Sequence, residues 1–194
     1  MSQLREYLTA VTRMVRGCIT CERPYVSMED YVADRGVGFA PAALTADEEA
    51  VVRAAAQAAW EAGCRFRVKE CYYNAQMLVS CDVTERLQYY EGFGLHIIAC
   101  LHGWAVINGK VVDLTWRRGD NYGVTEDPLE QRYVGTFDHE YIGIHFPEAE
   151  WPEFGATVID RWQENFPALQ VPRIGPPLEP YPEIPGETGR KLLA

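Results

Sequence analysis

The chain has 194 residues, of which 47% are hydrophobic and 24% charged, a composition typical of a globular protein and unlike disordered, collagenous or coiled-coil chains. Its formal net charge of −10 disfavours generic binding to a nucleic-acid backbone. No run of about 18 apolar residues occurs, so the sequence predicts no membrane span.

The first half of the chain contains two clear helix patterns. Apolar side chains recur at helical spacing over residues 4–15. A second helix is predicted after Thr45, because Thr45 and Glu48 fit a capping box, and Gly63 is a natural C-terminal cap. Residues 18–44, between these helices, are punctuated by proline and glycine, and we expect them to be irregular.

A third helix and a β-hairpin follow along the chain. The helix is predicted over residues 71–80. Residues 87–94 are aromatic and β-prone. Two apolar runs, 96–107 and 110–116, are separated only by an Asn-Gly pair, which is the strongest short-range signal for a hairpin.

The remaining third of the chain is less regular. Residues 117–131 are rich in turn formers, residues 133–137 show a strand pattern, and residues 148–166 show a helix pattern. Half of the twelve prolines lie between positions 172 and 185, so residues 171–194 are predicted to be an extended arm, either draped on the domain or loose. We therefore expect a single α+β domain, residues 1–170, with an antiparallel sheet packed on helices.

The residues suited to chemistry concentrate around the third helix and the hairpin. A thiol nucleophile needs a base within hydrogen-bond reach, and the base needs an acceptor that fixes its tautomer. Cys71 stands at the predicted start of a helix, where the dipole and free amides stabilise a thiolate and a developing oxyanion. His102 and Asp113 are the candidates for the base and its acceptor.

The register of the hairpin follows from its turn. If the Asn-Gly pair is a two-residue loop, Trp104 faces Asp113 and His102 faces Thr115. Residues two apart share a face of the sheet, so these four side chains point the same way. His102 and Asp113 are then diagonal neighbours, with backbones roughly 7 Å apart. An imidazole and a carboxylate at these positions are within reach of each other.

The order of a cysteine at a helix start, a histidine on a strand and an aspartate on the next strand resembles the papain-like and transglutaminase-like thiol enzymes. More narrowly, residues 69–137 resemble a set of small uncharacterised bacterial and phage proteins, through the segments KECYYNAQ, YYEGFG, HGWAVINGKVVDLTW and YVGTF. The chain departs from their pattern at Gly103 and Leu114, where alanine and proline are usual. Neither departure touches the three candidate residues.

The resemblance implies an α+β fold with the nucleophile at a helix N-terminus. It implies that Cys71 is the nucleophile, that His102 is the general base and then acid, and that Asp113 orients His102. It implies no particular substrate, because relatives of this fold include proteases, enzymes that cross-link or deamidate glutamine, amine acetyltransferases and inactive proteins.

Two functions from different classes remain open. The first is a cysteine-dependent hydrolase or acyl transferase, which acts through an acyl-enzyme on an amide, ester or thioester, with a protein or peptide among the substrates considered. The alternative is a catalytically inert binding or inhibitory protein on the same scaffold. An exposed sulfur beside His102 favours the enzyme, and a sulfur sealed in the core favours the inert scaffold. We expect no cofactor, no nucleic-acid partner and no membrane partner, and the sequence leaves the oligomeric state open.

Three further residues are candidates for a substrate cleft. Asn74 lies one helical turn beyond Cys71, where it either lines the cleft or hydrogen-bonds locally. Glu91 is a carboxylate amid aromatic residues in a strand; it is either a cleft residue or, the alternative we favour, an exposed edge position. Trp104 shares the face of His102 in the predicted register.

The remaining cysteines bear on metal binding and on the compartment. Cys18 and Cys21 have the spacing of half a zinc site or of a redox pair, but no second close pair accompanies them, so we expect plain thiols and no metal. Residues 1–17 lack the apolar core and cleavage pattern of a secretory signal. We therefore expect a cytoplasmic protein whose thiols are mostly reduced.

Overall fold

The computed structural model describes residues 2–18, 25–39, 42–67, 69–116 and 139–151. In these residues the expected α+β class, with an antiparallel sheet packed on helices, is confirmed. The elements in chain order are α1 (Gln3–Cys18), α2 (Met28–Arg35), β1 (Val37–Phe39), α3 (Ala46–Glu61), α4 (Cys71–Ser80), β2 (Leu87–Leu95), β3 (Ala99–Ile107), β4 (Lys110–Val112), β5 (Glu140–His145) and the 3-10 turn η2 (Glu148–Glu150).

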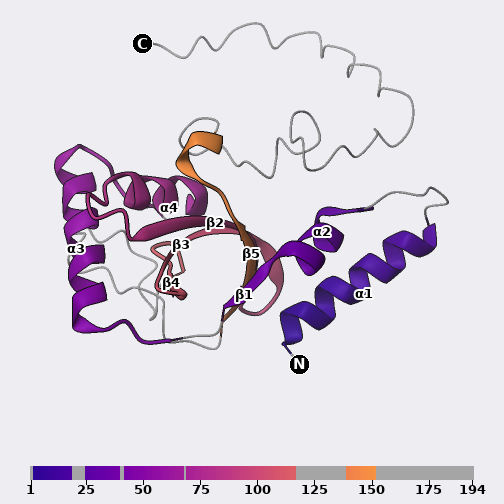
Figure 1. Ribbon diagram of the computed structural model, residues 1–194. Helices are drawn as coiled ribbons and strands as arrows, with labels where there is room; N and C mark the ends of the chain where they lie inside the picture. Colours follow the sequence, from indigo (N-terminus) through magenta and orange to yellow (C-terminus); the bar gives the residue numbers. More distant parts are fainter. Residues whose placement is uncertain (1, 19–24, 40–41, 68, 117–138, 152–194) are drawn as a thin grey trace, which may run out of the picture.

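The five described strands form one curved sheet in the order β1-β5-β2-β3-β4 (Figure 1). Every neighbouring pair is antiparallel. The hairpin of β2 and β3 is the longest pairing, running from Leu87 opposite Ile107 to Leu95 opposite Ala99. Since β2 pairs with β3 on one side and with β5 on the other, β2 is an interior strand.

The described helices pack against one face of this sheet in two groups, which lie at opposite ends of the sheet in Figure 1. At one end, α3 and α4 bury an aliphatic cluster that includes Val52, Ala56, Leu78, Ala105 and Ile107. At the other end, α1 and α2 bury a second cluster made of Leu4, Leu8, Val32, Phe93 and Ile142. Alternate residues of β2 and β3 therefore supply the floor of both clusters.

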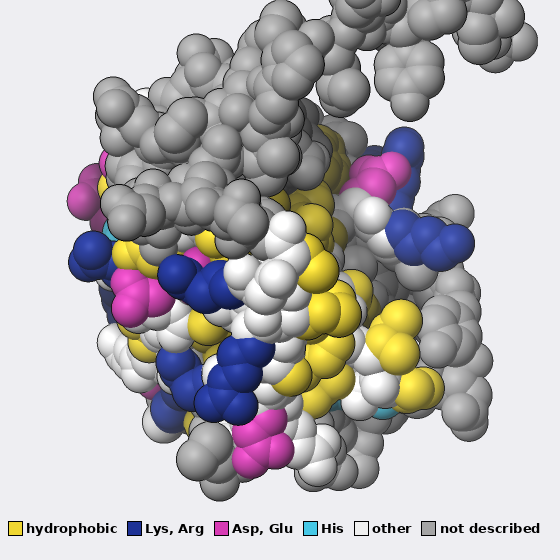
Figure 2. Space-filling view, turned by 90° about the vertical axis from the view of Figure 1, so that its right-hand side faces the viewer, with side chains coloured by type: hydrophobic (Ala, Val, Ile, Leu, Met, Phe, Trp, Pro, Cys, Tyr) yellow, Lys and Arg dark blue, Asp and Glu magenta, His cyan; other side chains and the backbone are white. Residues whose placement is uncertain are grey.

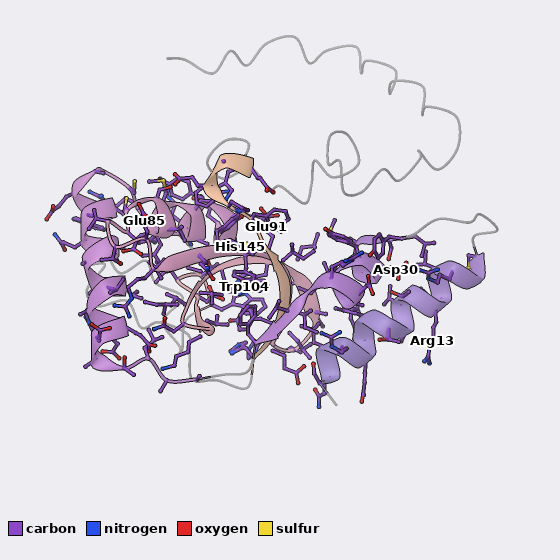
Figure 3. The ribbon with its side chains drawn as sticks, in the orientation of Figure 1. Arg13, Asp30, Glu85, Glu91, Trp104 and His145 are labelled. Carbon is purple, nitrogen blue, oxygen red and sulfur yellow. The ribbon has the colours of Figure 1, made fainter. Side chains whose placement is uncertain are left out.

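The opposite face of the sheet carries an aromatic cluster. Its buried members are Phe39, Trp104, Val106, Val111 and Tyr141, with Tyr90 and Trp116 packed against them. Figure 3 shows Glu91 and Trp104 on opposite sides of the sheet, in agreement with the pairing of Glu91 with Gly103 and of Tyr90 with Trp104. The two faces therefore differ in chemistry: aliphatic side chains predominate under the helices, and aromatic ones on the other side.

The predicted local structures around the hairpin are confirmed. Thr45 and Glu48 form the full capping box at the start of α3. Asn108 and Gly109 have φ values of +49° and +76°, as a two-residue hairpin turn requires, and Val106 pairs with Val111. The carboxylate of Glu48 also accepts hydrogen bonds from Asn108 Nδ2 at 3.0 Å and Lys110 Nζ at 2.7 Å. One side chain therefore caps α3 and holds the hairpin turn against it.

For the rest of the described residues, one prediction is wrong and one strand was not predicted. Residues 18–44 are not wholly irregular, because they contain α2 and β1. Ser27 caps α2 by accepting a hydrogen bond from the backbone of Asp30, but the helix has only eight residues and offers little periodicity to read. Strand β5 was not predicted, and its pairing with β1 joins positions about 100 residues apart.

Several predictions concern residues that the structure leaves undescribed. The turn-rich segment 117–131, the strand pattern at 133–137 and the proline-rich arm 171–194 lie outside the described residues. Of the helix pattern at 148–166, only the first four residues are described, and they form the 3-10 turn η2 followed by Trp151.

The surface of the described part mixes polar and apolar groups. Figure 2, viewed from the right-hand side of Figure 1, shows a band of hydrophobic side chains next to several basic ones. A search of the described helices finds none that combines the length and the apolar character needed to cross a membrane.

Candidate active site

Cys71 is the first residue of α4, as the sequence predicts. Within the described residues, no side chain caps the first turn of this helix. The turn lies close against β3 because position 103 is glycine: a Cβ there would stand 2.7 Å from Cδ1 and 3.2 Å from Cα of Tyr72. The absence of a side chain at Gly103 therefore lets the N-terminus of α4 approach the strand that carries His102.

His102 and Asp113 form the pair that the hairpin register predicts. Nε2 of His102 lies 2.7 Å from Oδ2 of Asp113, and both residues are buried, with 2% and 1% of their surface exposed. The same Oδ2 accepts a hydrogen bond from the hydroxyl of Tyr141 at 2.9 Å. Oδ1 accepts the backbone amides of Thr115 at 2.7 Å and Trp116 at 3.1 Å. Four donors thus orient one buried carboxylate.

The side chain of Cys71 lies close enough to that of His102 to help raise the pKa of the imidazole. Because Nε2 faces Asp113, Nδ1 is the ring nitrogen that remains for the thiol. The three side chains therefore stand in the order thiol, imidazole, carboxylate. Cys71 itself is buried, with 8% of its surface exposed.

The electrostatics of the pair favour an imidazolium beside a carboxylate. Burial disfavours the charged imidazole, but the charge and hydrogen bond of Asp113, with a smaller contribution from Cys71, raise the pKa of His102 to about 10. Burial likewise acts to raise the pKa of Asp113, but His102 and the amides of Trp116 and Thr115 hold that pKa below its usual value. Both directions agree with a charged pair at neutral pH.

The chain leaves the strand direction at Asp113. Regular pairing of β4 with β3 ends at Val112, and the bonds from Asp113 Oδ1 to the next two amides turn the backbone. The predicted pairing of Thr115 with His102 is therefore wrong. Thr115 instead accepts a hydrogen bond at 2.8 Å from Nδ2 of Asn74 on α4.

This turn places Trp116 over the imidazole. The two rings are nearly parallel, with centroids 4.1 Å apart and an interplanar angle of 17°. Trp116 can lie there because the residue of β2 next to the indole is Gly94, which has no side chain. A Cβ at position 94 would stand 2.6 Å from the indole ring. An indole face against an imidazolium is a favourable cation–π contact and shields one side of His102.

The structure settles the local partners of the three cleft candidates. Asn74 is buried, and its amide bonds both backbone groups of Arg67, with Oδ1 accepting at 3.0 Å and Nδ2 donating at 2.7 Å. With its bond to Thr115, Asn74 thereby ties the loop before Cys71 to the turn after Asp113.

Glu91 is fully buried on the interior strand β2, so the expectation of an exposed edge position is wrong. Its Oε1 accepts a hydrogen bond from the hydroxyl of Tyr89 at 2.7 Å, on the face covered by the helices.

Trp104 is also fully buried, in the aromatic cluster. Its ring is nearly parallel to that of His102, at a centroid distance of 6.3 Å. Among the described residues its indole nitrogen has no hydrogen-bond partner.

The other cysteines are in different surroundings. Cys18 is exposed at the end of α1, and Cys21 lies outside the described residues, so the geometry of the Cys18–Cys21 pair is not described. In the described ranges, no group of three or more histidine, cysteine, aspartate or glutamate side chains is arranged to hold a metal ion.

Sequence reasoning missed two residues of the site, Tyr141 and Trp116. Trp116 belongs to the quoted segment HGWAVINGKVVDLTW, so its presence near His102 and Asp113 was visible, but its stacking depends on the turn at Asp113. Tyr141 lies on β5, which carries no local signal that links it to the hairpin. In comparisons with known proteins, the chain matches no family model, no curated protein and no solved structure.

Proposed function

We propose that this protein is a cysteine-dependent hydrolase or acyl transferase with a papain-like or transglutaminase-like core. The observation that supports the proposal is the hydrogen bond of His102 to Asp113 beside Cys71, whose thiol stands at the first residue of a helix. The antiparallel sheet, which carries the histidine and places the aspartate at the end of the adjacent strand, is consistent with such a core.

In the proposed reaction, the proton of the Cys71 thiol resides on Nδ1 of His102, and the thiolate attacks the carbonyl carbon of an amide, ester or thioester. A carbon–sulfur bond forms, and the carbonyl oxygen becomes an oxyanion that backbone amides at the start of α4 are placed to stabilise. His102 then donates its proton to the leaving group as the bond to the carbonyl breaks. An acyl-enzyme remains on Cys71.

Release of the acyl group uses the same residues. Neutral His102 removes a proton from water, which yields a hydrolase, or from an amine or other acceptor, which yields a transferase. The deprotonated oxygen or nitrogen bonds to the acyl carbon, the carbon–sulfur bond breaks, and Cys71 leaves as a thiolate beside the imidazolium. Asp113 keeps Nε2 protonated through both steps and stabilises the imidazolium that forms. Trp116 covers one face of the ring, so substrate and acceptor must approach from the side of Cys71.

The burial of Cys71 favours the alternative, an inert binding or inhibitory protein on the same scaffold. For an enzyme we expect a sulfur that is exposed and lies beside His102. Cys71 lies beside His102, but only 8% of its surface is exposed. The two functions differ in one measurable property, which is covalent capture of an acyl group by the thiol.

The test is to incubate the full chain with an activated acyl thioester and to map the labelled residue by mass spectrometry. We expect acylation at Cys71, lost in Cys71→Ala and strongly slowed in His102→Gln. A parallel measurement compares iodoacetamide alkylation of Cys71 in the parent and in His102→Gln, where it should be much slower because the variant lacks the imidazole. Acylation elsewhere, or a Cys71 rate that does not depend on His102, rejects the enzyme and leaves the inert scaffold.

A further inference from the structure

One apolar side chain on the helix-covered face of β3 is exposed beside the start of α4. On this face Ala105 and Ile107 are buried in the first aliphatic cluster. Gly103, the preceding residue of the same face, lies against Tyr72. Leu101 comes next, because residues two apart share a face of a strand. Leu101 is 38% exposed, whereas every later residue of β3 is buried. The cover that α4 gives to β3 therefore ends between Gly103 and Leu101.

The other group of helices does not cover Leu101 either. Its partner on β2 is Phe93, which is buried in the second aliphatic cluster, with α1 and α2. This group of helices and the group that contains α4 lie at opposite ends of the sheet (Figure 1). Leu101 therefore stands between the two groups, with part of its side chain in contact with solvent.

The hairpin around Leu101 presents an apolar surface without charge. From residue 92 to residue 109 the chain contains no lysine, arginine, aspartate or glutamate, although 24% of the whole chain is charged. Ile97 and Ile98, in the connection from β2 to β3, are 83% and 73% exposed. With Leu101 they place three exposed aliphatic side chains within five residues, directly before His102. Exposed aliphatic groups that cluster in this way mark a binding surface.

The N-terminus of α4 is directed towards this surface. Tyr72, at the start of the helix, lies against Gly103, and Leu78, near its end, packs in the cluster that contains Ile107. The helix therefore runs along β3 away from Leu101, and the free amides of its first turn point back towards Leu101. In the proposed reaction these amides hold the oxyanion. The group attached to the reacting carbonyl then extends over the surface that begins at Leu101.

We propose that Leu101, together with Ile97 and Ile98, binds an apolar acyl group of the substrate, so that the enzyme prefers longer hydrocarbon acyl groups to acetyl. The inference rests on the proposed function and names the class of its substrate. In the covalent step, the Cys71 thiolate forms a bond to the carbonyl carbon and the bond to the leaving thiol breaks. His102 gives its proton to the leaving thiol. The hydrocarbon chain keeps all its bonds and contributes binding alone.

The size of the preference follows from the area that a hydrocarbon chain buries. Complete burial of one CH2 group changes a binding or rate constant about fourfold. An open surface covers a chain on one side, so we expect half of that free energy, or about twofold for each CH2 group. Hexanoyl has four more CH2 groups than acetyl and should therefore acylate Cys71 about 16-fold faster at equal concentration.

The experiment measures the second-order rate constant for acylation of Cys71 in the full chain by acetyl, butyryl and hexanoyl thioesters of one small thiol. Each rate constant is divided by that of the same thioester with free N-acetylcysteine, which removes differences in intrinsic reactivity. The normalised rate should rise from acetyl to hexanoyl in the parent. Leu101→Asn, which keeps nearly the shape of leucine but ends in a polar amide, should reduce the hexanoyl-to-acetyl ratio to about threefold or less.

A second variant and a control make the result specific to this surface. Leu101→Ala keeps a smaller apolar surface and should give an intermediate ratio. Both variants should fold, because the side chain is partly exposed in the parent. The matched control is Val83→Asn. Val83 is also exposed, but it lies beyond the C-terminal end of α4, so this variant should keep the ratio of the parent.

Equal normalised rates for the three thioesters overturn the inference, as does a hexanoyl-to-acetyl ratio that both Leu101 variants leave unchanged. The mass in solution is measured at the assay concentration. If the parent is a dimer that Leu101→Asn dissociates without a change in the ratio, the surface is an interface between copies of the chain and the inference is rejected. If Cys71 is acylated without a preference, the proposed function stands. If no thioester acylates Cys71, the proposed function itself is rejected.

Discussion

Replacement of Asp113 by asparagine separates the proposed catalytic role of the carboxylate from its structural role. In the native protein Oδ1 accepts two backbone amides, and Oδ2 accepts His102 and Tyr141. Asparagine has nearly the same shape, and its oxygen can still accept the two amides. Its Nδ2 replaces Oδ2 and cannot accept from either side chain. It donates to Nε2 instead, so the ring proton moves to Nδ1, the nitrogen that should receive the thiol proton.

The structure sets the size of both effects. A hydrogen bond to a charged group contributes about 1.5–3 kcal/mol, and two such bonds are lost while one buried charge disappears. We expect a loss of about 3 kcal/mol in the free energy of unfolding, which is roughly 6–12 °C in melting temperature for a chain of this size. The same replacement costs about four orders of magnitude in a serine triad. A thiolate needs less assistance, so we expect turnover to fall about 10²–10³-fold.

A pH titration of stability shows whether the carboxylate holds the imidazolium. Since the pKa of His102 is raised from 6.5 to about 10 in the folded protein, its contribution to stability is complete below about pH 6.5 and is lost as the pH rises through 10. The melting temperature of the parent should therefore decline over this range, and Asp113→Asn should show a flatter profile. The assay is differential scanning fluorimetry at several pH values, alongside acylation and alkylation rates of Cys71.

The matched control is Tyr141→Phe, which removes one donor to Oδ2 but keeps the charge and the tautomer. We expect it to cost about 1 kcal/mol and to leave Cys71 reactivity within about tenfold of the parent. If Asp113→Asn flattens the pH profile yet retains full acylation and turnover, the carboxylate is a structural group and the triad reasoning is refuted.

Three further predictions test the surroundings of the site. Gly103→Ala should push Tyr72 and the start of α4 away from β3, with a stability loss of about 1–3 kcal/mol and slower alkylation of Cys71; an unchanged Cys71 rate would show that the close approach is not needed. Glu48, whose pKa is lowered to about 2 chiefly by Lys110, should stabilise the fold above about pH 4.5 and lose that contribution as the pH falls through 2. The loss of unfolding free energy caused by Glu48→Gln, measured with urea, should therefore shrink as the pH falls. A loss that stays the same at every pH would contradict the ion pair. A metal chelator should leave the melting temperature unchanged, whereas a fall of many degrees with zinc released would assign metal ligation to the C-x-x-C pair.

Part of the candidate site was predictable because the local structures that hold it follow short-range rules. A capping box links residues three apart, a two-residue turn dictates the register that follows it, and both are confirmed. The approach of His102 to Asp113 follows from the hairpin register, and α4 begins at Cys71 as predicted. Composition and periodicity likewise predicted the α+β class.

Tertiary structure alone decided the rest of the site. Glu91 is buried because β5 pairs with β2 on the side that the sequence left open, and no local pattern connects strands about 50 residues apart. Tyr141 reaches Asp113 through that same pairing. Trp116 lies over His102 because the buried carboxylate turns the chain and Gly94 leaves room for the ring. Side chains brought together by distant strands depend on packing that the periodicity of a single segment does not encode.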